Sequence, residues 1–233
     1  MNKYNYQFIY KFKQQLTTCT MKTLTLLVLI LVSISVSAQR EYLFNGVDLS
    51  NWKIVTKPTS ADIDTVFYVE DSVINIKGKP FGYIKTLKEY ENYDLHVEWR
   101  WVEKPKNSGV LLHVVGQDSV WPQNVEAQLW HTNAGDLVLL HEGAKATIKG
   151  VSHINKPGDK WWNIQKKFEE SSENTPGEWN SYDITCENAS VMFTVNGVLQ
   201  HTATDVYPNK GYIGFQGEGA WIQFRNIYIE EKE

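Results

Sequence analysis

The stretch Val125-Glu126-Ala127-Gln128-Leu129-Trp130-His131 has the alternating pattern of a β-strand. Successive side chains of a strand point to opposite faces, so the apolar residues at positions 125, 127 and 129 should face a core. Glu126, Gln128 and Trp130 then share the other face. A carboxylate and an amide can bind hydroxyl groups, and an indole can stack on the C–H face of a sugar ring. The stretch therefore predicts a sugar-binding strand; a merely exposed sheet face is the alternative.

Short β-rich runs separated by turn signals continue through the chain after residue 38. The longest predicted strand is Tyr93–Trp101, and Asn196-Gly197 is the strongest hairpin signal. Residues 154–176 are polar and predict a long loop across one face. No long segment after residue 38 has helical periodicity. The pattern predicts a single all-β domain, either a sandwich or a jelly roll.

The N-terminal residues predict a secretory leader. An apolar run covers residues 24–36, preceded by Lys22 and ending in the small residues Val36-Ser37-Ala38. This is typical of a signal peptide at residues 21–38 with cleavage after Ala38, and residues 1–20 then belong to a mis-called start. A membrane anchor is the alternative, but the run is shorter than the roughly 20 residues that a span needs. We expect residues 39–233 to form the exported domain, periplasmic or extracellular, without stable membrane insertion.

Charge and cysteine content narrow the class of partner. The full chain has a net charge of −4, and without the four lysines of residues 1–38 there are 19 basic and 27 acidic residues, a net charge of −8. Nucleic acid is therefore a disfavoured partner, because phosphate binding needs a basic patch. Cys186 is the only cysteine after residue 38, so no intramolecular disulfide is expected. The nine Trp, twelve Tyr and nine Phe residues can fill a core and still supply aromatic surface for binding.

Several motifs, in this order, resemble the 3-keto-disaccharide hydrolase family over nearly all of residues 39–233. They are Phe44–Trp52, Glu98-Trp99-Arg100, Asn107–Val110, Glu126-Ala127-Gln128, Gly177–Asn180, Val195–Val198, Gln216–Gly219 and Phe224–Ile227. The resemblance implies a concanavalin A-like jelly-roll β-sandwich of two antiparallel sheets. It also implies cleavage of glycosides already oxidised at C3 of the sugar, by hydrolysis or elimination, generally with the help of a metal ion.

The chemistry of a 3-keto sugar sets what such a site must supply. The ketone makes the hydrogen on C2 acidic, because its removal gives an enolate, and the C1 substituent can then leave by β-elimination. Water can add afterwards to give net hydrolysis. The protein must provide a base near C2, an electrophile at the C3 oxygen and a proton donor for the leaving oxygen.

The candidate catalytic residues depend on a hypothesis about strand pairing. If strands 93–101, 108–115 and 125–131 are neighbours, one concave face carries Glu98, Arg100, His113, Glu126 and Gln128. Glu126 and His113 are then the candidates for base and acid. Glu98, His113 and Glu126 are the tentative ligands of a divalent metal of unspecified identity, although their spacing is not diagnostic.

Further polar and aromatic residues are predicted to bind substrate. An ion pair on the sheet would equally explain Arg100, and turn geometry would equally explain Asn107. Trp161 and Trp162 form either a sugar-stacking lid or a loop packed by its own aromatics. The predicted substrate-binding residues are Arg100, Asn107, Gln128, Trp130, His131, Gln216 and Glu218.

Three other functions are compatible with the sequence. A non-catalytic, lectin-like carbohydrate-binding module is the main alternative, because lectins and glycosidases share this architecture. An ordinary glycosidase would use Glu98 and Glu126 as its two carboxylates. A structural domain of a surface assembly is the third. The density of ionisable residues in the motifs favours an enzyme that acts on a small sugar or glycoside.

Overall fold

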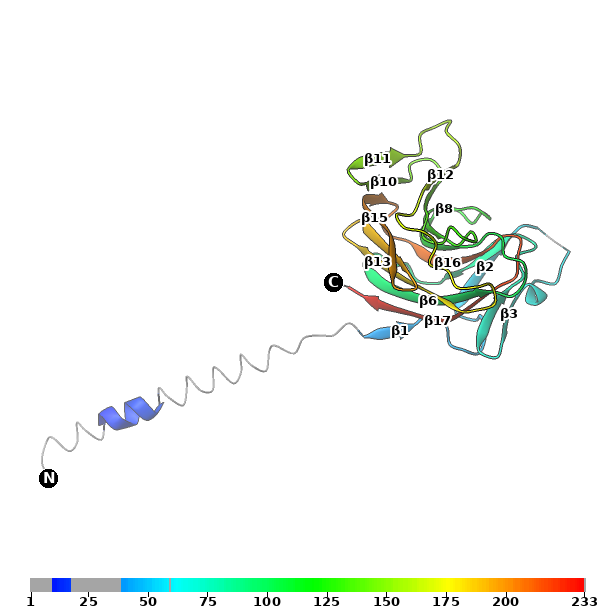
Figure 1. Ribbon diagram of the computed structural model, residues 1–233. Coiled ribbons are helices and arrows are strands. Elements are labelled where there is room, and N and C mark those ends of the chain that lie inside the picture. Colours follow the sequence, from blue (N-terminus) through cyan, green and yellow to red (C-terminus); the bar gives the residue numbers. More distant parts are fainter. Residues whose placement is uncertain (1–9, 18–38, 59, 233) are drawn as a thin grey trace, which may run out of the picture. The chain divides into compact units, whose positions relative to one another are not determined.

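The computed structural model describes residues 10–17, 39–58 and 60–232 (Figure 1). Residues 10–17 are helical and belong to a unit, residues 1–37, that is separate from the compact unit of residues 38–233. The predicted signal peptide and its cleavage site lie outside the described residues. None of the helices in the described ranges is long and apolar enough to cross a bilayer.

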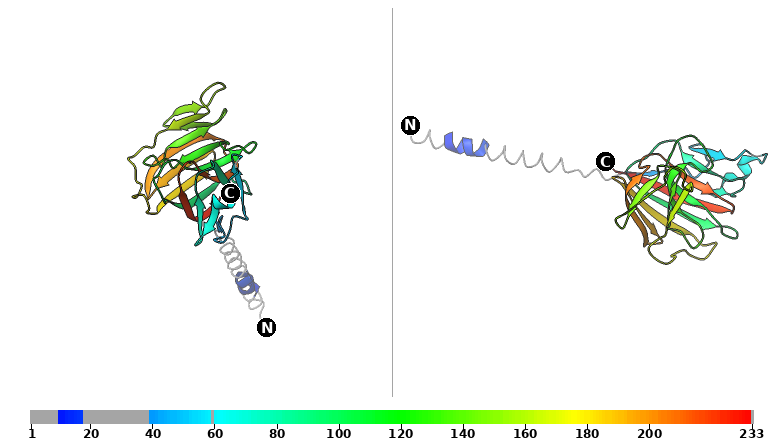
Figure 2. Two further views of the ribbon diagram at one scale, coloured as in Figure 1. Left: turned by 90° about the vertical axis from the view of Figure 1, so that its right-hand side faces the viewer. Right: turned by 90° about the horizontal axis from the view of Figure 1, so that it is seen from above.

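Residues 38–233 form a β-sandwich of two antiparallel sheets (Figures 1 and 2). The larger sheet has ten strands in the order β11 (Val151–Ile154), β10 (Lys145–Ile148), β15 (Val198–Tyr207), β14 (Ser190–Val195), β13 (Asn180–Glu187), β6 (Tyr93–Trp101), β17 (Ile222–Glu231), β4 (Val73–Ile76) and β3 (Phe67–Glu70), with β1 (Arg40–Tyr42) also paired to β17. The smaller sheet has seven in the order β12 (Trp162–Gln165), β9 (Leu137–Leu140), β8 (Gln123–Gln128), β7 (Gly109–Val115), β16 (Tyr212–Gly217), β5 (Gly82–Thr86) and β2 (Trp52–Thr56). One short 3-10 helix, η1 (Ile63–Thr65), precedes β3. The predicted fold class is confirmed.

The core lies between the two sheets and is filled by alternate residues of the strands. Val97 and Trp99 of β6 are fully buried, and the apolar residues 125 and 127 of β8, with residue 129 just after this strand, belong to the same core cluster from the other sheet. A one-residue slip of either strand would expose this apolar set, so the burial also fixes the register. Cys186 of β13 belongs to the same core, where burial raises the pKa of its thiol to about 12.

The β7–β8 loop covers part of the outer face of the seven-stranded sheet, and the rest of this face is open. A small apolar cluster of Val55, Tyr83, Leu111 and Val114 occupies the covered part. Beside it, Asp118 of the β7–β8 loop forms ion pairs with Lys53 (2.6 Å) and with the buried Lys85 (2.7 Å). These contacts hold the loop on the sheet, and the functional pocket lies in the open part, next to the end of this loop.

The predicted pairing is right for two strands and wrong for the third. β7 pairs with β8, as expected for residues 108–115 and 125–131. β6 instead pairs with β13 and β17 in the other sheet. The segment predicted as a long loop contains the strand β12, which extends the smaller sheet beyond β9. The β10–β11 hairpin extends the larger sheet at its far end (Figure 1).

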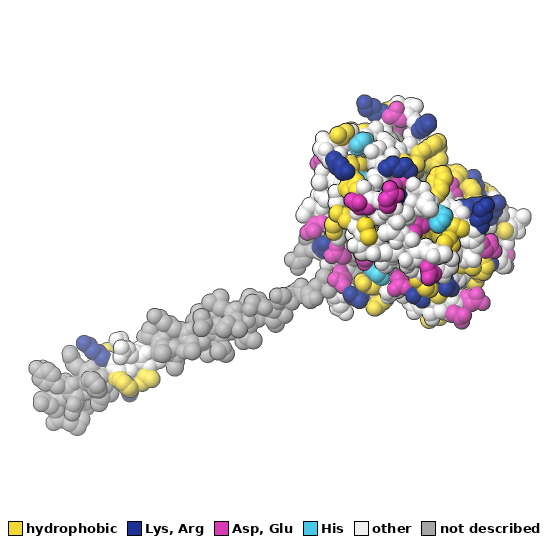
Figure 3. Space-filling view, viewed as in Figure 1, with side chains coloured by type: hydrophobic (Ala, Val, Ile, Leu, Met, Phe, Trp, Pro, Cys, Tyr) yellow, Lys and Arg dark blue, Asp and Glu magenta, His cyan; other side chains and the backbone are white. Residues whose placement is uncertain are grey.

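Charges of both signs are interspersed over the molecular surface that faces the viewer in Figure 3. Lysine and arginine side chains lie next to aspartate and glutamate side chains on this face, and no single-sign region dominates it.

Candidate active site

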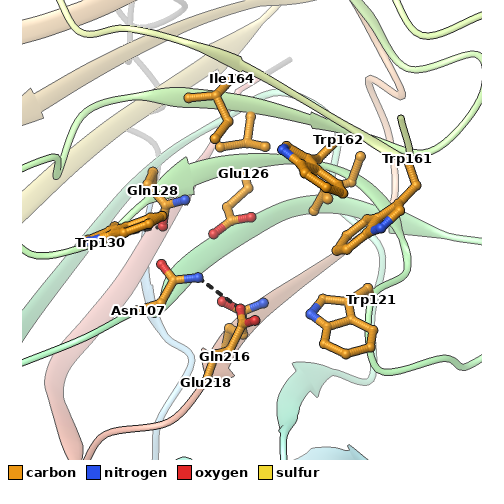
Figure 4. Close-up of a pocket in the computed structure, with 12 residues that line it drawn as sticks. Asn107, Trp121, Glu126, Gln128, Trp130, Trp161, Trp162, Ile164, Gln216 and Glu218 are labelled. Atoms are coloured by element: carbon orange, nitrogen blue, oxygen red, sulfur yellow. Dashed lines mark hydrogen bonds between the residues drawn. The ribbon is translucent and has the colours of Figure 1, made fainter. Parts of the chain in front are cut away.

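A pocket of about 530 Å³, counted to its open mouth, lies on the outer face of the seven-stranded sheet (Figure 4). Its floor and walls come from β8, β9, β12, β16 and the segments next to them. The lining residues are Asn107, Trp121, Glu126, Gln128, Trp130, Val138, Leu140, Trp161, Trp162, Ile164, Gln216 and Glu218.

Glu126 is the central polar group of the pocket (Figure 4). Its side chain is only 4% exposed, and its Oε1 atom has no hydrogen-bond partner in the described chain. Burial raises the pKa of its carboxyl group to about 8, and the negative charge of Glu218 adds to the shift. Glu126 is therefore mostly protonated at neutral pH, the state required of a proton donor.

Gly109 makes room for Glu126 on the neighbouring strand. A Cβ atom at position 109 would overlap the Oε1, Cδ and Cγ atoms of Glu126. The backbone of Gly109 does not have a positive φ, so an alanine there would meet only this steric obstacle. The glycine of the Asn-Ser-Gly motif thus has a packing role that positions the acid.

Glu218, the second carboxylate, is held by Asn107. The Asn107 side-chain amide donates to Glu218 Oε2 at 2.8 Å, and the two residues form an isolated β-bridge. Burial raises the pKa of Glu218, while hydrogen bonds from Asn107 and Trp121 favour its ionised form. The oxygens Asn107 Oδ1 and Gln216 Oε1 are buried without partners among the described residues, so both can accept hydrogen bonds from ligand hydroxyl groups.

Gln128 and Trp130 form the side of the pocket opposite the other indoles (Figure 4). The side-chain oxygen of Gln128, Oε1, accepts hydrogen bonds from the backbone N–H groups of Leu129 (2.9 Å) and Trp130 (3.0 Å). This leaves its amide nitrogen on the pocket side (Figure 4). Trp130 is 53% exposed, so its ring is available at the mouth. The predicted grouping of Asn107, Glu126, Gln128, Trp130, Gln216 and Glu218 is present in the structure.

His131 does not line this pocket, contrary to its predicted place among the substrate-binding residues. Its Nδ1 lies 3.1 Å from Glu173 Oε2, and Glu173 Oε1 also accepts from the backbone N–H of Ala134 at 3.1 Å. The His131 side chain points away from the pocket, on the opposite side of the chain from its neighbour Trp130. Its contact with Glu173 connects the 130–136 loop to the segment that contains Glu173.

Three tryptophans form the opposite wall. The rings of Trp161 and Trp162 are 4.9 Å apart at 71°, and those of Trp121 and Trp161 are 5.5 Å apart at 45°. The rings of Trp161 and Trp162 pack on each other, as the second alternative for these residues predicts, and both also line the pocket. Trp121 was not among the residues predicted from sequence, and its position before Pro122 is its only local signal.

Glu98 and Arg100 lie on the outer face of the ten-stranded sheet, so their predicted place beside Glu126 is wrong. Glu98 accepts hydrogen bonds from Arg225 Nε (2.6 Å) and Asn226 Nδ2 (3.0 Å). Arg100 Nε donates to Gln223 Oε1 at 2.7 Å. The error follows from the pairing of β6, because an alternating strand presents the same pattern in either sheet. In place of the ion pair that was the structural alternative, Arg100 has this hydrogen bond to a neutral amide, and its guanidinium group lies over the ring of Trp179 at 4.6 Å.

His113 also lies away from Glu126, because the backbone of β7 contains an irregularity at this residue. His113 has a φ of 54°, and the registers of β7 with β8 and with β16 both shift around it. Its ring packs against Tyr93 of the other sheet (5.5 Å), and its Nδ1 lies 3.2 Å from the carbonyl oxygen of Pro208. Burial lowers the pKa of His113 to about 4. The predicted catalytic pair of Glu126 and His113 is therefore not assembled.

The predicted metal ligands Glu98, His113 and Glu126 cannot share an ion, because they lie on the outer face of one sheet, inside the core and in the pocket. Within residues 10–17, 39–58 and 60–232, no three or more His, Cys, Asp or Glu side chains are placed to hold a metal.

The placement of Glu98 gives a testable prediction. Glu98→Gln should leave the activity of the pocket unchanged, because the side chain is on the opposite sheet. It should lower the free energy of unfolding by about 1 kcal/mol, since a charge-assisted hydrogen bond to Arg225 is weakened at a partly exposed position. Urea denaturation and steady-state kinetics would check both. A large loss of activity with unchanged stability would contradict this placement.

A β-sandwich of this kind can carry enzymes as well as non-catalytic binding domains, so the fold alone does not set the function. The model of the family described as "3-keto-alpha-glucoside-1,2-lyase-like domain" matches residues 39–230. The chain belongs to this family. No protein among those with curated functions matches it in sequence.

Solved structures share the fold at low sequence identity. A candidate glycosyl hydrolase from Parabacteroides distasonis is 22% identical, with a TM-score of 0.61 over 83% of this chain and 94% of that one. A β-glucanase from Bacillus licheniformis is 11% identical, with a TM-score of 0.54 over 85% of this chain and 100% of that one. A carbohydrate-binding module from Bacillus subtilis is 10% identical, with a TM-score of 0.51 over 78% of this chain and 96% of that one. At these identities the likeness concerns the fold.

Proposed function

We propose that the protein is an exported enzyme that cleaves 3-keto-glycosides by removing the C2 proton and eliminating the C1 substituent. The observation that carries this proposal is the pair of Glu126 and Glu218 in one pocket, with the pKa of the more buried acid raised to about 8. Family membership supports the substrate class. The apolar leader at residues 24–36 supports export.

Each of the two carboxyl groups carries out one of the two proton transfers. Glu218, which receives hydrogen bonds that favour its ionised form, takes the proton from C2, and the electrons of that C–H bond form the enolate with the C3 oxygen. The amide nitrogen of Gln128 donates to this oxygen. The enolate electrons then form the C1–C2 double bond as the C1–O bond breaks, and protonated Glu126 supplies the proton to the leaving oxygen. Water added across the double bond would convert elimination into net hydrolysis.

Cleavage of a chromogenic 3-keto-glucoside, compared with its unoxidised parent, tests the proposed function. The protein from Gln39 should cleave only the keto form, because the parent lacks an acidic C2 hydrogen, and a chelator should leave the rate unchanged. Loss of activity with chelator would mean that the pocket oxygens bind a cation, and the assignment of Glu126 as the acid would then be wrong. Cleavage of the parent as well would identify an ordinary glycosidase.

The pH profile of kcat/KM separates the roles of the two acids. Glu126 must be protonated, so activity should fall as pH rises through about 8. Glu218 must be ionised, so activity should also fall as the pH drops through its pKa, which lies above the ordinary value of 4.5. Glu126→Gln should remove the alkaline limb along with most of the activity. An activity that rises through pH 8 would show instead that Glu126 is the base.

A non-catalytic carbohydrate-binding module is the second candidate, favoured by the exposed Trp130 and the unpartnered oxygens of the pocket. Stacking and hydroxyl binding do not require a buried neutral acid, which costs stability at neutral pH. Measurable glycan binding without turnover of any keto-glycoside would establish this candidate.

A further inference from the structure

The proposed proton transfers use only one side of the pocket. On the other side of Glu126 from Gln128 and Trp130, the lining is apolar (Figure 4). Val138 of β9 is the cross-strand neighbour of both Glu126 and Ile164, and Leu140 is that of Trp162, so these aliphatic side chains line the pocket beside Glu126 and on toward the indoles. The lining of this wall is completed by Trp121, Trp161 and Trp162.

This wall is ill-suited to a second sugar ring. Among its six side chains, only the indole N–H groups can form hydrogen bonds, and that of Trp121 already interacts with Glu218. A second sugar would bury hydroxyl groups against aliphatic carbon, at a cost of about 1–3 kcal/mol for each unpaired group. A flat aromatic ring has no such groups, and it can meet the mutually inclined indoles with its face and its edge.

The wall is held in place by contacts outside the pocket. His141 Nε2 lies 2.6 Å from the carbonyl oxygen of Trp121, and the His141 ring stacks on Trp161 at 5.7 Å. The backbone N–H of His141 donates to the carbonyl oxygen of Trp161 at 2.7 Å. His141 therefore ties two of the three indoles together before a ligand arrives, which lowers the ordering cost of binding.

We propose that this wall is a leaving-group subsite that selects aryl over sugar leaving groups, so that the substrate class is 3-keto-glucosides of aromatic alcohols. This inference rests on the proposed function for the position of the keto sugar, which lies over Gln128 and Trp130. Glu126, between the two sides, then faces the bond between sugar and aryl group.

Equilibrium binding tests the subsite without requiring turnover. Calorimetric titrations of the wild-type protein would compare phenyl glucoside, methyl glucoside and a glucose disaccharide, all unoxidised. Phenyl glucoside should bind about tenfold more tightly than methyl glucoside, as expected for one stacked aromatic contact, and more tightly than the disaccharide. A disaccharide that binds as tightly as phenyl glucoside, or a series in which phenyl glucoside shows no binding, would overturn the proposal.

Two variants test which side of the pocket produces the preference for the phenyl group. Trp161→Ala should reduce the phenyl-to-methyl affinity ratio to about one, while Trp130→Ala on the sugar side should weaken both ligands by a similar factor and keep the ratio. Thermal unfolding would show that both variants are folded, and Trp162→Ala replaces Trp161→Ala if that variant is not. A ratio that survives Trp161→Ala, or Trp162→Ala where that variant replaces it, contradicts the subsite. An aryl preference without turnover of keto-glycosides would refute the proposed reaction alone, whereas turnover of keto-disaccharides without an aryl preference would refute the subsite alone.

Discussion

Glu126→Gln should make the protein more stable at neutral pH while it abolishes catalysis. The pKa of Glu126 is about 8 in the folded state against an ordinary value of 4.5, so folding at pH 7 must protonate a group that is ionised in the unfolded chain. Each pH unit in this window costs about 1.4 kcal/mol, which gives a penalty on the order of 3 kcal/mol at pH 7. Glutamine keeps the shape without the proton uptake.

The expected pH dependence of folding stability shows in which direction Glu126→Gln changes it. Because the folded pKa is raised, the wild-type protein should lose stability as pH rises from about 4.5 to about 8, and the variant should not. Urea denaturation of both proteins at pH 4 and pH 7 should therefore show equal stability at the lower pH and a gap at the higher one. Glu98→Gln is the matched control, since that change removes a carboxylate on the opposite sheet. A variant less stable than wild type at pH 7 would mean that Glu126 is ionised in the folded protein.

The loss of catalysis has a separate cause. Glutamine cannot give a proton to the leaving oxygen, and removal of a general acid typically reduces the rate by about 10²–10⁴-fold. A substrate whose leaving group needs no protonation should be affected less. Equal losses for good and poor leaving groups would count against Glu126 as the acid.

Gly109→Ala should have the second-largest effect, through steric displacement of the same carboxylate. The new methyl group would overlap Glu126 side-chain atoms, and crowding of a packed site costs about 1–3 kcal/mol of stability. The acid would also move from its position, and a displacement of about 1 Å can cost about a hundredfold in rate. Urea denaturation and kcat measurements would record both effects.

A double variant distinguishes overlap from a general effect on β7. Glu126→Ala removes the atoms that the methyl group meets, so Gly109→Ala should cost much less stability in that background than alone. Additive losses in the double variant would show that Gly109 is needed for another reason.

The local features of the sheets could be predicted from sequence, but which strands pair could not. The alternation in residues 125–131 correctly placed Glu126 and Gln128 opposite the core, because side-chain direction in a strand follows from the covalent geometry. The same rule failed at His113, where one residue with left-handed backbone turns the side chain into the core. Histidine adopts a positive φ more often than most residues, but only a small fraction of histidines do so, and the sequence around His113 therefore does not mark the irregularity.

The assignment of strands to sheets explains the remaining errors. β6 has the alternation of a strand in either sheet, so Glu98 and Arg100 were placed on the wrong one. The pocket residues that were predicted correctly lie on β8, on β16 or beside them. Trp121 was missed because a loop carries it to the pocket, through an ion pair of Asp118 with Lys85 across 33 residues of sequence. No local pattern encodes such a contact.

Cys186 provides a way to measure how often the folded domain opens. In a protein that begins at Gln39 it is the sole thiol, and in the folded state it is buried between the sheets with its pKa raised to about 12. A thiol reagent in solution can reach it only when the two sheets separate around β13, and the thiolate forms readily only once that has happened. The rate of labelling by that reagent therefore measures how often the sandwich opens under native conditions, without an introduced cysteine.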